Sequence, residues 1–205
     1  MDMRTRVRAT GLTVAVVVVV VGALTVGSAA ALTYQWSWAP RYTDVSADNR
    51  TWEYRQPSAA TGQKSVHELS ARRDRGDDSK GRAEAARRTT FEPVQATGVR
   101  VSFFGRSSEA DNDPVARLKV YVHCVGELES EWVLVGGKDV TPNTNSDLLQ
   151  RSITTEDCPS QTVDGVMLQV LTGERGDRRR RTVYLERAEL RQGGSATWTE
   201  DFTAP

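Results

Sequence analysis

The sequence predicts an all-β protein, an antiparallel β-sandwich preceded by one N-terminal transmembrane helix. Three observations predict it: an apolar run near the N-terminus, alternating apolar and polar residues in the second half, and no long stretch with a helical period. The 205 residues suit one domain with a short appendage. Zero formal net charge argues against a nucleic-acid binder, and two histidines with two cysteines argue against a closed zinc site.

Residues 11–32 form the predicted transmembrane helix or signal anchor. They read GLTVAVVVVVVGALTVGSAAAL, and 16 of these 22 residues are Ala, Val or Leu. As a helix the run spans about 33 Å, enough to cross a hydrocarbon core of about 30 Å and to contact membrane lipid. Residues 1–10 carry three arginines against one aspartate, which predicts a cytoplasmic N-terminus and an extracytoplasmic C-terminal part.

A cleaved secretory signal is the alternative interpretation of the same segment. Small residues at 28–31 would suit a cleavage site. A retained anchor is favoured because the apolar run is long and because Tyr34, Trp36 and Trp38 follow it, as in an interfacial aromatic belt. Both interpretations place the remainder of the chain outside the cytoplasm.

Three regions are expected beyond the apolar run. Residues 33–62 are interpreted as a membrane-proximal stalk or as the donor of a first strand through Thr51–Tyr54. Residues 63–90 are interpreted as a charged loop, disordered or exposed, because the stretch from 71 to 88 has no large apolar side chain. Residues 91–205 are long enough for the sandwich and its core.

Period-two alternation predicts where the strands lie. The main candidates are 99–103, 118–125, 132–135, 166–170 and 182–185, and the shorter ones are 51–54, 150–155 and 196–202. Gly136-Gly137 is interpreted as a turn, and a phase shift before Ala188 indicates a bulge. Six to nine short strands separated by turns are typical of an antiparallel sandwich.

Two segments resemble strands of galactose-binding-like domains. Residues 91–101, FEPVQATGVRV, resemble the F-x-P-V-x-A-x-x-V-R-V strand of discoidin-type modules, and residues 183–190, VYLERAEL, are similar to the closing strand of these jelly rolls. The resemblance covers about residues 91–191. It implies an eight-stranded jelly roll and a non-catalytic module, of the carbohydrate-binding kind, that binds glycans, lipids or protein partners. The family's N-terminal aromatic and loop signatures are not recognisable before Phe91.

Two covalent features are expected in the exported part. Cys124 and Cys158 are the only cysteines, and in an oxidising compartment an isolated pair forms one disulfide. Closing a loop of about 35 residues contributes on the order of 3–4 kcal/mol by the loop-entropy model. Asn49-Arg50-Thr51 is a sequon, which predicts N-glycosylation at Asn49.

Candidate ligand-binding residues are chosen by their chemistry. Aromatic rings can stack on sugar faces, and the candidates are Trp52, Tyr54, Tyr121 and Trp132. Oxygen ligands in a flexible loop suit calcium, the one cofactor considered, and the candidates are Glu109, Asp111, Asn112 and Asp113. For both sets the competing interpretation is structural, as core aromatics and as a solvated turn.

No nucleophile elbow, phosphate loop, H-E-x-x-H or paired C-x-x-C motif occurs in the sequence. We therefore expect no catalytic residues and a membrane-anchored binding or structural module. At a cell or virion surface such a module would associate with protein partners, with other copies or with a glycan, and not with nucleic acid. Two alternatives stay open: a carbohydrate-binding module secreted after signal cleavage, and a membrane-tethered hydrolase with two carboxylates in a concave site.

Overall fold

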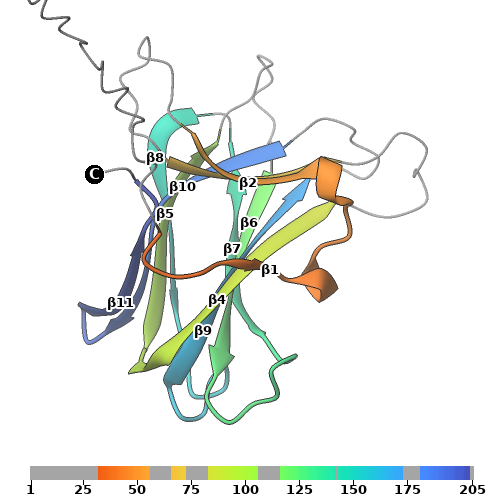
Figure 1. Cartoon of the computed structure of the whole chain (residues 1–205). Coiled ribbons are helices and arrows are strands. Elements are labelled where there is room, and N and C mark those ends of the chain that lie inside the picture. The colour runs from red at the N-terminus through yellow and green to blue at the C-terminus, as the bar shows by residue number, and fades with distance from the viewer. Residues whose placement is uncertain are drawn as a thin grey trace, which may run out of the picture.

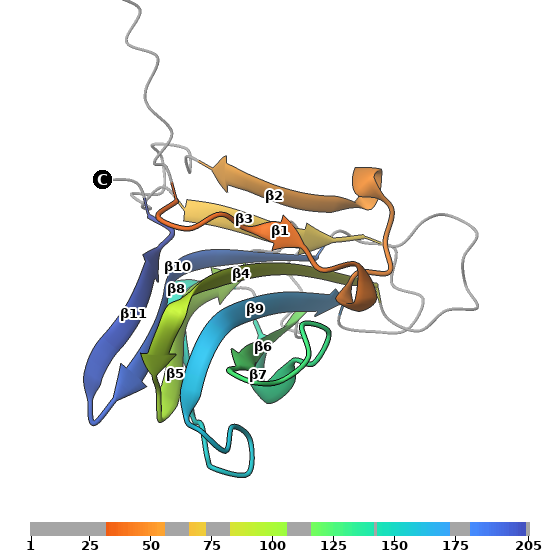
Figure 2. The ribbon, with the colours of Figure 1, turned by 60° about the horizontal axis from the view of Figure 1, so that its bottom comes forward.

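Two antiparallel β-sheets face each other in the computed structural model (Figures 1 and 2). The structure describes residues 32–55, 66–72, 83–105, 116–141, 143–172 and 181–203. Its strands are β1 (Ser37–Trp38), β2 (Arg50–Arg55), β3 (Val66–Ala71), β4 (Glu84–Gln95), β5 (Gly98–Gly105), β6 (Ala116–Cys124), β7 (Val133–Val140), β8 (Asn143–Ser152), β9 (Thr162–Thr172), β10 (Arg181–Gln192) and β11 (Ser195–Asp201). The short 3-10 helices η1 (Pro40–Tyr42) and η2 (Ala47–Asn49) lie between β1 and β2. The predicted all-β sandwich is confirmed.

The strand order is that of a jelly roll with added strands. One sheet has the order β1-β4-β9-β6-β7, and the other has the order β2-β3-β10-β5-β8 with β11 paired to β10. Counting β3 to β10 as one to eight, the sheets contain strands 2-7-4-5 and 1-8-3-6. The chain therefore wraps back and forth between the layers as two Greek keys do. The strands β1, β2 and β11 extend the two layers.

The core lies between the sheets and follows the alternation that the sequence shows. Side chains at every second position of β5, β6 and β9 face inward and are almost completely buried: Val99, Val101, Phe103, Leu118, Val120, Val122, Val166, Leu168 and Val170. The expected bulge in β10 is also present, because its register to β5 shifts between Leu185 and Arg187. Cys124 at the end of β6 is joined to Cys158 by the predicted disulfide.

The sandwich begins earlier in the chain than residue 91. Strand β3 and the first half of β4 lie within residues 63–90, where the sequence analysis expected a loop. Val66, Leu69 and Ala85 are completely buried there. The expectation was wrong for these strands because the inward positions of β4 carry alanine and arginine, which give no apolar alternation. Residues 73–82 of the same stretch lie outside the described part of the chain.

Gly136 and Gly137 are not the expected turn, because both lie inside β7. A Cβ atom at Gly136 would lie 2.6 Å from Cγ of Arg151, whose side chain crosses the strand there. The glycine therefore serves the close approach of a side chain from the facing sheet rather than a change of chain direction.

The predicted cytoplasmic segment 1–10 and nearly all of the predicted membrane helix 11–32 lie outside the described residues. Within the described ranges, none of the helices is both long and apolar enough for a membrane crossing.

A segment at residues 32–38 runs along one edge of the sandwich, where β1 pairs with β4 (Figures 1 and 2). The carboxylate of Glu200, which is completely buried, holds this segment. It accepts the backbone N–H groups of Thr33 and Tyr34 at 2.9 and 3.0 Å and the indole N–H of Trp36 at 3.0 Å. One buried anion thus ties the N-terminal segment to β11.

Candidate functional site

The outward face of the six-stranded sheet carries rows of polar side chains across β8, β5 and β10. Partners in an antiparallel ladder lie on the same face of the sheet. Ser102 is paired with Arg187, Arg100 with Glu189, and Gly98 with Arg191. Since Val99, Val101 and Phe103 between them point into the core, these rows point to solvent.

A cavity of about 350 Å³ lies over the first two of these rows. Its lining residues come from four strands and from the end of the chain: Arg100, Ser102, Ser146, Glu186, Arg187, Glu189, Asp201 and Thr203. The bulge in β10 adds Glu186 beside Arg187, so two charged side chains line the cavity opposite one residue of β5. Every lining side chain is polar.

A second cavity of about 300 Å³ lies over the next row along the same strands. It is lined by Thr97, Gly98, Val99, Gln150, Arg151, Ser152, Arg191 and Gly194. The two cavities occupy successive rows, because Arg100 pairs with both Gln150 and Glu189 and Gly98 pairs with both Ser152 and Arg191. We call the two cavities together the outer groove. From Gly98 to Ser102 it follows β5 for about 13 Å at roughly 3.3 Å per residue.

Ion pairs and hydrogen bonds hold the side chains of the outer groove in place. Arg187 Nη2 lies 2.9 Å from Asp201 Oδ2, and Arg191 Nη1 lies 2.7 Å from Glu189 Oε2. The hydroxyl of Ser146 donates to Glu186 Oε1 at 2.7 Å. The groove is therefore arranged before any ligand binds.

The electrostatics of Asp201 and Arg187 follow from this pairing. Burial raises the pKa of Asp201, but hydrogen bonds from Thr203 and Arg187 outweigh it, so the net shift is downward. The hydrogen bond to Asp201 raises the pKa of Arg187. Both groups are ionised at neutral pH, as a positioned donor and a positioned acceptor.

One end of the outer groove meets a pair of aromatic rings. Phe104 and Tyr184 are ladder partners next to the Ser102 row, and their rings stack with centroids 5.0 Å apart. Tyr184 is half-buried, whereas Phe104 is 5% exposed. An aromatic surface and a polar groove therefore adjoin on one face of the sheet.

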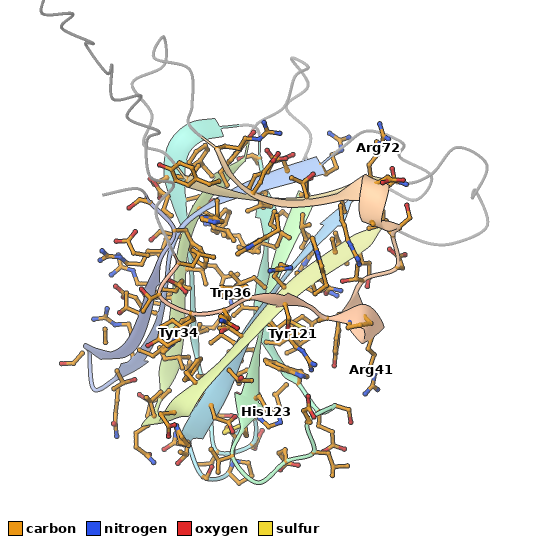
Figure 3. All side chains as sticks on the ribbon, in the orientation of Figure 1. Tyr34, Trp36, Arg41, Arg72, Tyr121 and His123 are labelled. Carbon is orange, nitrogen blue, oxygen red and sulfur yellow. A yellow bond between two sulfur atoms is a disulfide. The ribbon has the colours of Figure 1, made fainter. Side chains whose placement is uncertain are left out.

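The four aromatic residues that the sequence analysis singled out do not come together. Trp52 and Tyr54 lie on the edge strand β2, and both rings contact His67. Tyr121 lies on β6 of the other sheet and Trp132 directly precedes β7, and the two pack in one cluster with Met167. Figure 3 shows Tyr121 below the N-terminal segment that carries Trp36. Tyr121 and Trp132 are only 7% and 9% exposed, so little of either ring is free to stack on a sugar.

The hydrolase alternative requires a pair of carboxylates, one of them with a shifted pKa, and outside the outer groove Asp44 and Glu84 are a described pair of this kind. Burial, and then the charge of Asp44, raises the pKa of Glu84. Yet Asp44 Oδ1 accepts the backbone N–H of Glu84 at 2.6 Å, and Glu84 Oε2 accepts from Gln169 at 2.9 Å. Gln169 also donates to the carbonyl of Tyr42. The arrangement holds η1 against the sheet and directs these groups at the protein itself.

The candidate glycosylation site Asn49 is 2% exposed. Its Nδ2 donates to Ser46 Oγ at 3.0 Å, and its Oδ1 accepts from Nη2 of Arg72, labelled in Figure 3, at 3.1 Å. A glycan on Nδ2 would need space that the folded chain fills. N-glycosylation at Asn49 stays a prediction, and this geometry stands against it.

The calcium candidates at Glu109, Asp111, Asn112 and Asp113 lie outside the described residues. Among the residues that are described, no group of three or more His, Cys, Asp or Glu side chains could hold a metal ion.

Sequence reasoning missed the outer groove as a site. The signal was present in β10, where Tyr184, Glu189 and Arg191 fall at its outward positions. The sequence does not show the register, and only the pairing of β5 with β10 and β8, together with that of β10 with β11, brings the rows into one groove.

Solved structures similar to this chain include carbohydrate-binding modules of the β-sandwich type. One, described as having promiscuous specificity, is 14% identical over 75% of this chain with a TM-score of 0.42, and this chain spans 54% of its length. CBM27-1 of Caldicellulosiruptor saccharolyticus, in complex with mannohexaose, is 11% identical with a TM-score of 0.46, over 73% of this chain and 87% of its own. The non-crystalline cellulose specific module CBM28 is 9% identical with a TM-score of 0.47, over 82% and 86%. No protein-family model and no curated protein matches the chain.

Proposed function

We propose that this protein is a non-catalytic module that binds a neutral, polyhydroxylated polymer, an oligosaccharide chain, along the outer groove. The observation that carries the proposal is the alignment of two polar cavities along β5 and β10. A sugar hydroxyl both donates and accepts hydrogen bonds, so it suits a groove in which guanidinium donors and carboxylate acceptors alternate.

The charge of the outer groove supports a neutral ligand. Three arginines, Arg100, Arg187 and Arg191, line it together with three carboxylates, and Arg187 and Arg191 are paired with carboxylates of the same lining. The side chain of Arg151 extends instead to Gly137 of the facing sheet. A groove for a polyanion would instead carry an uncompensated cationic row. Because the charged groups are already fixed by one another, binding orders few additional side chains.

The full-length chain can be tested with two neutral hexasaccharides, mannohexaose and cellohexaose, by titration calorimetry. We expect one of them to bind and Glu189→Gln to weaken that binding about tenfold, because the variant loses a charged acceptor and frees Arg191. Arg117→Gln is the matched control, since Arg117 pairs with Asp139 on the five-stranded sheet. Equal affinity in both variants, or no binding of any neutral oligosaccharide on a broader array, would overturn the proposal.

We further propose that the module is displayed outside the cytoplasm, tethered by residues 11–32. The disulfide Cys124–Cys158 supports an oxidising compartment. Release after signal cleavage is the competing form and fits the same fold. Mass spectrometry of the protein isolated from its native membrane distinguishes them, because a mature N-terminus near Leu32 would eliminate the tether. Crosslinking before extraction tests the expected lateral association with other copies or with envelope proteins.

A further inference from the structure

Two arginines and two tryptophans stack at the edge of the sandwich that β1 and β2 form. Arg50 lies 4.5 Å from the ring centroid of Trp38, and Arg87 lies 4.8 Å from that ring and 5.1 Å from the ring of Trp52. We call these four residues the arginine–tryptophan edge. They come from both layers, because Arg50 and Trp52 belong to β2 whereas Trp38 and Arg87 pair across β1 and β4.

All four side chains face the space between the sheets. Trp52 is paired with Leu69, and Arg87 is paired with Leu168, and both leucines are completely buried in the core. The four residues are nevertheless half-buried rather than sealed. The arginine–tryptophan edge is therefore partly open to solvent, and its two guanidinium groups lie against aromatic rings.

The positive charge of this edge has no carboxylate partner among the described residues. Neither Arg50 nor Arg87 forms an ion pair there. Arg87 donates Nη2 to the carbonyl of Trp36, while its Nε is buried without a hydrogen-bond partner. Nδ1 of the neighbouring His67 is also buried without one. Buried polar atoms without a hydrogen-bond partner are rare in a folded protein.

The energetics favour an added anion. Burial, and then the charge of Arg50, lowers the pKa of Arg87 to about 10. Burial, opposed by a backbone hydrogen bond with Phe202, lowers the pKa of His67, so the imidazole is neutral at pH 7 and adds no competing charge. The rings stabilise each guanidinium through cation–π contact, but they do not neutralise the repulsion between the two.

We propose that the arginine–tryptophan edge is an oxyanion-binding site, in which a sulfate or carboxylate group lies between Arg50 and Arg87 and is flanked by Trp38 and Trp52. Guanidinium groups bind such anions through charge-assisted pairs of hydrogen bonds, and Arg50 and Arg87 supply the two guanidinium groups. The anion is a free ion or an acidic substituent on a larger ligand. The site is separate from the outer groove and does not depend on it.

Inorganic sulfate is the probe for this site, titrated into the full-length chain at constant ionic strength with tryptophan fluorescence as the readout. We expect a saturable change with a dissociation constant on the order of 1 mM. Arg87→Gln should weaken binding by about tenfold or more, and Arg50→Gln by a smaller factor. Arg50 is on an edge strand, so its variant provides the test if Arg87→Gln fails to fold. Sulfate should also raise the melting temperature of the wild type.

The double variant Lys138→Gln/Asp147→Asn is the matched control, because it removes an inward-facing pair at the opposite edge. It should bind sulfate as the wild type does. A fluorescence change that is linear in sulfate concentration, or that is equal in the wild type and both arginine variants, would overturn the proposed site. A sulfated disaccharide that binds more tightly than sulfate identifies a substituent on a larger ligand, and equal affinity identifies a free ion. Displacement of sulfate by the unsulfated disaccharide would contradict an oxyanion site.

Discussion

At both open edges of the sandwich a cationic side chain faces inward, but different groups stabilise its charge. At the β7/β8 edge, Lys138 and Asp147 both face inward from opposite sheets, and their Nζ and Oδ1 atoms lie 2.5 Å apart. Lys138 also donates to the carbonyl of Leu148 at 3.1 Å. At the β1/β2 edge, Arg50 and Arg87 face inward from opposite sheets and meet tryptophan rings instead.

Both edges use long cationic side chains, whose stems cover apolar surface while their heads reach water. An inward-pointing charge also discourages pairing with another chain. At the first edge the charge is cancelled by Asp147. At the second it is stabilised by aromatic faces and stays uncancelled among the described residues. Edge closure therefore requires the stem of the cation but not a carboxylate, so the charge of the second edge is available for binding.

The largest expected effect comes from removing the buried carboxylate of Glu200, which holds the N-terminal segment at the arginine–tryptophan edge. Glu200→Ala should lower the free energy of unfolding by about 3 kcal/mol, because three donors that now meet a buried carboxylate would lose it. The segment carrying Trp36 and Trp38 would then detach, and the sulfate response should disappear with it. Urea unfolding measures the loss, with the exposed Glu92→Ala as control. A variant as stable as that control would show that Glu200 does not hold the edge.

Removing the Trp38 ring, which contacts both Arg50 and Arg87, should destabilise the β1/β2 edge in a way that depends on salt. Trp38→Leu should cost about 2 kcal/mol at low ionic strength, because it removes two cation–π contacts and leaves Arg50 and Arg87 repelling each other. Salt screens that repulsion, so the cost should shrink in 0.5 M NaCl. Urea unfolding at two salt concentrations measures it. A cost that grows with salt would mean that the two guanidiniums do not interact.

The difference between the edges could not be predicted from the sequence, although much of the core could. Val101, Val120 and Leu168 lie on strands where large apolar residues alternate with polar ones, so their inward faces were predictable. Strand β4 has no such signal, because its inward positions carry Ala85 and Arg87. An arginine facing inward becomes reasonable only when β1 and β2 supply tryptophan rings, and that pairing is a tertiary fact.

The functional residues, too, could be predicted from the sequence only in part. Residue type alone selected Tyr121 and Trp132 as sugar-stacking candidates, but packing on the five-stranded sheet buries them. The outer groove depends on the register between Arg100 and Glu189, which are 89 positions apart in the chain. The disulfide was predictable because only Cys124 and Cys158 were available.

A smaller effect is expected from breaking the ion pair at the β7/β8 edge. Asp147→Asn should cost about 0.5–1 kcal/mol at pH 7, since both side chains are more than a third exposed. Burial raises the pKa of Asp147, but hydrogen bonds from Lys138 and from the Leu148 backbone outweigh it and lower the pKa overall. The stability that this carboxylate contributes is therefore present above its unfolded pKa of about 3.9 and is lost as the pH falls further.

Urea unfolding at pH 7, 4 and 3 tests this dependence, with Asp139→Asn as the exposed comparison. The wild type and Asp147→Asn should converge as the pH falls below about 4. A gap that stays constant down to pH 3 would show that the charge of Asp147 is not what stabilises this edge.

The smallest effect on stability should come from replacing His67, which lies beside the arginine–tryptophan edge. Burial lowers its pKa, a backbone hydrogen bond with Phe202 opposes the shift, and the charge of Arg87 adds to it. At pH values just below about 6.5, the unfolded chain therefore binds a proton at His67 more readily than the folded chain does. The free energy of unfolding falls as the pH drops below that value. His67→Gln should flatten this slope between pH 7.5 and 5.5 in urea unfolding. Equal slopes in the two proteins would show that His67 takes up its proton in the folded state despite the charge of Arg87. The arginine–tryptophan edge would then carry less positive potential than its geometry implies.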